Sequence, residues 1–144
     1  MNSQKFILGG IVGGVVFFLL GWLIYGMLLK DYMATNMSAP GTMRADADMI
    51  WWALILGQFA GGFLMAYVIA KANATSAGAG AGVGFIVGLL VCLSYDLTMY
   101  AVSTTIVSLK GVAIDAAISA VMSAIVGAVV AWVMAMGKKT VAAA

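Results

Sequence analysis

The sequence predicts an all-α membrane protein, a bundle of four transmembrane helices that forms a single domain over residues 1–144. The composition indicates a membrane protein. Hydrophobic residues make up 65% of the chain and charged residues only 8%, whereas a soluble domain has about 45–50% apolar and about 25% charged residues. A soluble domain could not cover its surface with so few polar side chains.

Four apolar segments are long enough to cross a bilayer, which takes about 20 helical residues. We expect the spans at about residues 6–29, 49–70, 79–103 and 112–136. The first is too long for the core of a signal peptide and no clear cleavage site follows it, so we expect a retained anchor. Short connections join the spans, apart from the loop at residues 30–48.

The charges predict that both termini face the cytoplasm. The cytoplasmic ends of the spans then carry four lysines, against three basic residues on the outside, which is a weak positive-inside pattern. All five acids are aspartates, and they lie in the outer loop or in the outer halves of the last two spans. The four cytoplasmic lysines are Lys5, Lys71, Lys138 and Lys139.

Glycines at four-residue spacing predict where the helices pack. Residues four apart share a face of a helix, and small residues mark the helix contacts of membrane proteins. The second span has such a pair in Gly57 and Gly61, and the third has a stripe of three in Gly80, Gly84 and Gly88. We expect these glycines to face other helices, in the same chain or in another copy.

Asp96 is the strongest candidate for a functional residue. It lies within the third span, on the stripe that continues from Gly88 through Cys92. A charged side chain at mid-span costs about 2.5–3.5 kcal/mol by insertion scales, so such residues face the bundle interior and mark functional sites. Two interpretations remain open: Asp96 is part of a ligand or ion site, or it bonds to a neighbouring helix and fixes the register of the bundle.

Asp115 is the second candidate, near the outer end of the fourth span. It could serve as a cap there, because a negative charge is favoured at a helix N-terminus. It could also pair with Asp96, provided that the third span ends early and a true loop follows. We expect supporting polar contacts to this site from Gln58, Tyr95 and Thr98.

The residues that are missing exclude several classes of site. The chain has no histidine and a single cysteine, Cys92. A histidine-ligated haem, a histidine-containing zinc site and a Ser-His-Asp triad are therefore excluded, as is a disulfide within the chain. We expect no metal, no cofactor and no catalytic residue. A net charge of +2 does not indicate nucleic-acid binding.

Two short motifs resemble known families. The run Tyr95-Asp96-Leu97-Thr98, with Asp115 opening the last span, resembles a family of small four-span bacterial inner-membrane proteins that has no assigned activity. Met99 stands where that family usually has asparagine. Residues 21–28 (GWLIYGML) are similar to the end of the first helix in a related family. The resemblance implies a multi-pass protein of the bacterial inner membrane.

We therefore expect a non-enzymatic membrane protein that binds or moves a small cation, a proton or a hydrophobic solute at Asp96. The alternative is an accessory or structural subunit of a larger membrane complex. A membrane enzyme ranks third, since two carboxylates do not define a reaction. The expected partners are the lipid bilayer and either further copies of the chain or other subunits.

Overall fold

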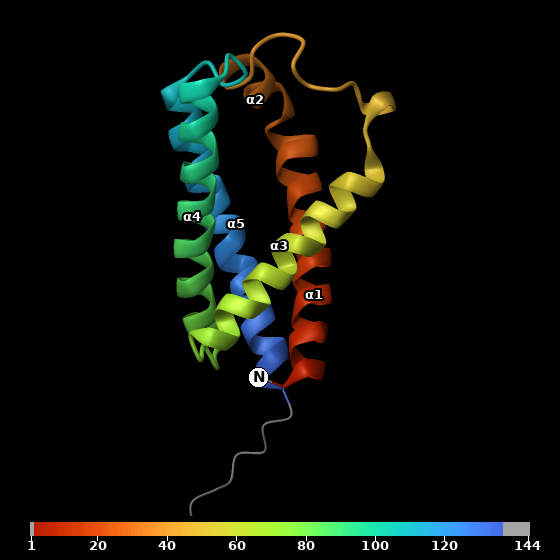
Figure 1. Ribbon diagram of the computed structural model, residues 1–144, viewed down its shortest axis with the longest axis vertical. Coiled ribbons are helices and arrows are strands. Elements are labelled where there is room, and N and C mark those ends of the chain that lie inside the picture. The colour runs from red at the N-terminus through yellow and green to blue at the C-terminus, as the bar shows by residue number, and fades with distance from the viewer. Residues whose placement is uncertain (1, 137–144) are drawn as a thin grey trace, which may run out of the picture.

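The computed structural model describes residues 2–136, which form a bundle of four long helices (Figure 1). This confirms the prediction of an all-α, four-span membrane bundle, because each long helix is apolar and long enough to cross a membrane. The four spans run over residues 3–28, 51–71, 77–102 and 109–135, within three residues of the predicted bounds.

The first span has two parts, α1 (Ser3–Gly21) and the π-helical segment η1 (Trp22–Leu28). The other spans are α3 (Trp51–Lys71), α4 (Ala77–Val102) and α5 (Leu109–Ala135). Two short elements lie between the first two spans: the helix α2 (Lys30–Asn36) and the 3₁₀ turn η2 (Asp46–Asp48).

The two ends of the bundle differ in what they contain. At one end, which we call the terminal end, Lys5 Nζ donates a hydrogen bond to the carbonyl oxygen of Met136 at 2.8 Å. At the other end, the loop end, residues 37–50 and 103–108 connect the helices. The two ends of the described chain thus lie on one side of the membrane. Two of the lysines used for orientation, Lys138 and Lys139, lie outside the described residues.

The predicted orientation can be checked by labelling single cysteines in intact cells. In a Cys92→Ser background we expect Met43→Cys to react with a membrane-impermeant maleimide, because Met43 is exposed at the loop end. Thr75→Cys, exposed in the turn at the terminal end, should react only after the cells are permeabilised. The opposite pattern would place the termini outside the cytoplasm.

A closely packed interface joins α4 to α5. A Cβ atom on Gly80 would collide with the backbone of Gly127, and one on Gly84 would collide with the backbone of Ser123. A Cβ on Gly88 would collide with the Ser123 side chain. The glycine stripe predicted for the third span therefore lies against the next helix of the same chain, where it lets two backbones approach.

The interface of α1 with α3 uses a different glycine from the predicted pair. A Cβ on Gly62 would meet backbone atoms of Gly10 and Gly14 in α1, and Gly61 makes an ordinary contact with Phe17 at 3.6 Å. Gly57 meets no other helix of this chain, because open space surrounds it, and its contact with another copy stays a prediction. Gly57 precedes Gly62 by five residues, a rotation of about 140° around an α-helix, so it faces away from α1.

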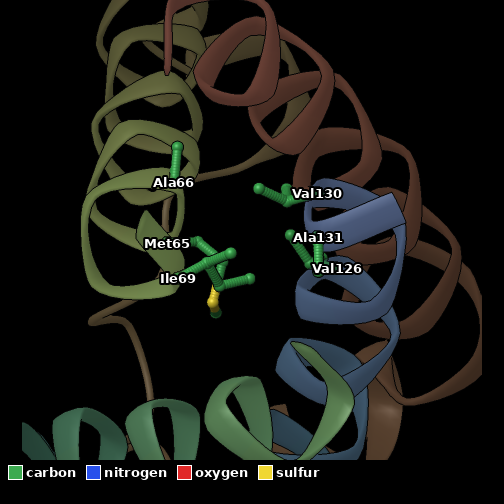
Figure 2. Close-up of a cluster of buried hydrophobic side chains, with 6 residues drawn as sticks. All are labelled: Met65, Ala66, Ile69, Val126, Val130 and Ala131. Carbon is green, nitrogen blue, oxygen red and sulfur yellow. The ribbon is translucent and has the colours of Figure 1, made fainter. Parts of the chain in front are cut away.

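The main buried cluster lies between α3 and α5 near the terminal end. Figure 2 shows Met65 and Ile69 of α3 directed toward Val126 and Val130 of α5. These four side chains are at most 1% exposed. Ala66 and Ala131 complete the cluster.

A second cluster closes the loop end of α4 and α5. Met37, Ile106 and Val112 are buried together. Backbone hydrogen bonds hold the two connections against each other: Ala39 N–H donates to Thr105 O at 2.8 Å, and Val107 N–H donates to Met37 O at 2.9 Å. The connection after α2 is thus packed onto the α4–α5 hairpin.

The loop-end half of α3 leaves the bundle. Figure 1 shows α3 (yellow to light green) crossing the other helices diagonally. All of residues 51–57 are exposed, including Trp52 at 69% and Leu56 at 60%. This half of α3 is therefore not covered by the other helices, and the candidate site lies where the following residues of α3 face α4 and α5.

Candidate functional site

A cavity of about 390 Å³ lies between the helices, with residues of α1, α3, α4 and α5 around it. Most of its wall is apolar, and polar side chains gather on the α4–α5 side. The apolar residues include Phe17, Leu64, Met65, Val87, Val91 and Met122. The polar residues are Gln58, Cys92, Tyr95, Asp96, Asp115, Ser119 and Ser123.

Asp96 and Asp115 meet in this cavity, with the thiol of Cys92 between them. The thiol lies 3.3 Å from Asp96 Oδ2 and 3.4 Å from Asp115 Oδ2. It carries one hydrogen and so donates to one carboxylate at a time. Asp96 is only 3% exposed and therefore lies in the protein interior, whereas Asp115 is half-buried.

The antiparallel hairpin of α4 and α5 explains why the two acids meet. Asp96 lies six residues before the last residue of α4, and Asp115 lies six residues after the first residue of α5. At about 1.5 Å per residue, both stand about 9 Å below the loop end. The predicted start of the fourth span at residue 112 was late. The helix begins at Leu109 because Ser108 caps it, accepting a hydrogen bond from Gly111 N–H at 3.2 Å.

Tyr25 joins the site from the first span. Its hydroxyl donates to Asp115 Oδ1 at 2.5 Å and lies 3.2 Å from Ser119 Oγ. Tyr25 belongs to η1, where Leu29 N–H donates to Ile24 O, five residues back, at 2.8 Å. Single π-helical turns of this kind occur frequently at functional sites. Sequence reasoning missed Tyr25 as a site residue; the available signal was a tyrosine in the motif at residues 21–28, at the end of the first span.

Replacing Tyr25 by phenylalanine is expected to lower the stability of the bundle by about 1–3 kcal/mol, because a hydrogen bond to a carboxylate is lost inside the protein. Unfolding by denaturant in detergent micelles measures this change. Tyr67→Phe is the matched control, since the Tyr67 side chain is 47% exposed. Equal unfolding midpoints for the two variants would contradict the bond between Tyr25 and Asp115.

The other predicted residues divide into two groups. Gln58 and Tyr95 line the cavity, although the hydrogen bonds of Asp115 go to Tyr25 and Cys92 instead. Thr98 does not join the site: it is exposed, and its hydroxyl donates to its own helix at Ser94 O, 2.6 Å away. It lies two residues from Asp96, which puts it on nearly the opposite face of α4.

The cavity holds negative groups and no positive ones. Its lining contains two aspartates and no lysine or arginine. Within residues 2–136 the one salt bridge joins Lys30 to Asp46 on the surface. Two unit charges 4 Å apart repel by about 4 kcal/mol at an effective dielectric constant of 20. The pair therefore needs a proton or a cation to relieve this repulsion.

A metal ion is one cation that these residues could hold. Cys92, Asp96 and Asp115 each offer one ligand atom, and the three atoms lie within 4.8 Å of one another. We did not predict this cluster from the sequence, because its members come from two helices and only one of them is a cysteine.

No model of a known protein family, no curated protein and no solved structure matches the chain. The resemblance of Tyr95-Asp96-Leu97-Thr98 to a family of small four-span proteins stays a prediction.

Proposed function

We propose that this multi-pass membrane protein binds a proton or a small cation between Asp96 and Asp115 and moves it within the membrane, without catalysing a reaction. One observation carries the proposal: a carboxylate pair, with Asp96 buried, lines a cavity whose wall contains no lysine or arginine. From the resemblance, we place the protein in the bacterial inner membrane.

The neighbours of the pair support binding at this site. The Tyr25 hydroxyl and the Cys92 thiol each direct a donor at a carboxylate. Both are neutral donors, so they orient the carboxylates and leave the negative charge in place. Carboxylates kept inside a membrane without a permanent counter-charge are typical of proton and ion pathways.

Infrared difference spectroscopy of the protein in lipid nanodiscs tests this proposal. We expect the wild type to show the carbonyl band of a protonated carboxyl group that Asp96→Asn removes. The matched control Asp48→Asn, an exposed acid at the loop end, should keep the band. Added Na⁺ is the probe for cation binding, and it should weaken the band by displacing the proton. Identical spectra for the wild type and Asp96→Asn, with no effect of Na⁺, would overturn the proposal.

The alternative function is that of an accessory subunit, in which the loop-end half of α3 contacts another membrane protein or a second copy. The exposed residues 51–57 favour it, and so does the open face at Gly57. This alternative predicts a stable complex in mild detergent, and it predicts that Leu56→Arg would break that complex while Leu90→Arg, equally exposed on α4, would not.

A further inference from the structure

We propose that the cation taken by this cavity is an amphipathic organic cation, an amine or onium ion with an apolar body, and that it enters sideways from the bilayer. This inference rests on the proposed function, because it uses the same carboxylate pair as the counter-charge. It adds the chemical class of the ligand and its route.

The size and lining of the cavity indicate a ligand that is larger than a bare ion. Its volume of about 390 Å³ falls in the range of about 300–1,000 Å³ for small-molecule sites. A proton or a bare metal ion needs only the gap between the carboxylates. The apolar wall, which includes Phe17, Val87 and Met122, would add nothing to the binding of such an ion. It would contact the hydrocarbon part of a larger ligand.

The exposed lining residues indicate that the cavity opens toward the bilayer. Three lining residues are exposed: Leu64 at 45%, Val91 at 54% and Tyr95 at 63%. Leu64 is residue 14 of the 21 in α3, and Val91 is residue 15 of the 26 in α4. Exposed side chains at these heights face acyl chains rather than water, so the opening is lateral. Tyr95 adds a hydroxyl at its edge.

Packed residues lie beyond the cavity toward each end of the bundle. Toward the loop end, the buried cluster of Met37, Ile106 and Val112 lies one turn beyond Asp115. Toward the terminal end, the main buried cluster of α3 and α5 begins at the lining residue Met65. The exposed lining residues therefore mark the side of the bundle between α3 and α4 as the route.

Charge selects among the solutes that dissolve in a bilayer. The cavity places negative groups at one end of an apolar chamber. An amphipathic cation enters the membrane with its apolar body and satisfies the carboxylates with its charged end. An anion of the same shape would be repelled, and a neutral molecule would leave the pair without a counter-charge.

Binding of methyltriphenylphosphonium to the protein in nanodiscs tests the inference by equilibrium dialysis, with empty nanodiscs subtracted. We expect saturable binding that falls at least tenfold in Asp96→Asn and is unchanged in Asp48→Asn. Triphenylethane, in which carbon replaces the phosphorus, has the same shape without the charge and should not bind saturably. Equal binding of the two compounds would overturn the inference.

The lateral route is tested at the opening. Val91→Trp should reduce phosphonium binding at least tenfold by filling the opening. The control is Val121→Trp on α5, where the valine is 57% exposed and does not line the cavity; it should bind like the wild type. Equal binding by the two variants would exclude this route.

The infrared band separates the two proposals. If the carboxyl band persists but the phosphonium does not bind to the wild type, the inference fails while the proposed function stands. If the wild type lacks the carboxyl band and Na⁺ has no effect, both the proposed function and the inference are refuted. In Val91→Trp, retention of the band shows that the carboxylate site is still folded.

Discussion

Replacement of Asp96 by asparagine is expected to abolish proton flux through the protein. Asparagine has nearly the same volume and can still accept the hydrogen bond from the Cys92 thiol, but it cannot take up a proton or balance a cation. Proteoliposomes with an entrapped pH-sensitive dye measure the rate after a pH jump. We expect the wild type to exceed empty liposomes and Asp96→Asn to fall at least tenfold, to the background rate.

Two controls make this result specific to Asp96. Asp48→Asn removes the same charge at an exposed position and should keep the wild-type rate. The unfolding midpoint of Asp96→Asn in detergent should stay near that of the wild type, which would show that a loss of flux is not a loss of fold. A wild-type rate in Asp96→Asn, or no flux in the wild type, would refute transport through this residue.

Replacement of Gly84 by alanine is expected to lower the free energy of unfolding by about 1–3 kcal/mol, the usual cost of overpacking. The added Cβ would overlap the backbone carbonyl oxygen of Ser123 and lie 3.2 Å from the Cα of Ala124. A side chain could relieve the overlap by changing its rotamer, but backbone atoms cannot. The helices α4 and α5 must therefore separate. Titration with sodium dodecyl sulfate in mixed micelles measures the change.

Gly82→Ala is the matched control on the same helix, because nothing lies within 4 Å of its added Cβ. It should leave the stability unchanged or raise it by up to about 1 kcal/mol, since alanine favours a helix over glycine. If Gly84→Ala were as stable as Gly82→Ala, the two backbones could not be in contact at this position.

The fold was largely predictable because long segments of high hydropathy identify the helices that cross the bilayer. Four apolar segments of sufficient length leave few other arrangements. The pattern of small residues was less informative about partners. It identifies a face but not the helix that covers it, so it predicts a contact at Gly57, whereas the contact with α1 uses Gly62.

The candidate site was predictable only in part. Asp96 and Asp115 were identifiable because charge is costly inside an apolar span. Whether they meet depends on their heights, which in turn depend on the N-cap at Ser108. The contribution of Tyr25 depends on the π-helical turn of η1, and a periodicity analysis that assumes 3.6 residues per turn cannot place a residue in such a turn.

The diagonal path of α3 has a consequence for the surrounding membrane. With 21 residues, α3 is about 31 Å long, against about 40 Å for the 27 residues of α5. Its tilt (Figure 1) shortens its projection along the bundle further. The protein surface is therefore hydrophobic over a shorter distance along the membrane normal on the α3 side. Lipids adapt to a short hydrophobic surface by local thinning of the bilayer. We expect uneven bilayer thickness around this protein, with the thinnest part beside the opening of its cavity.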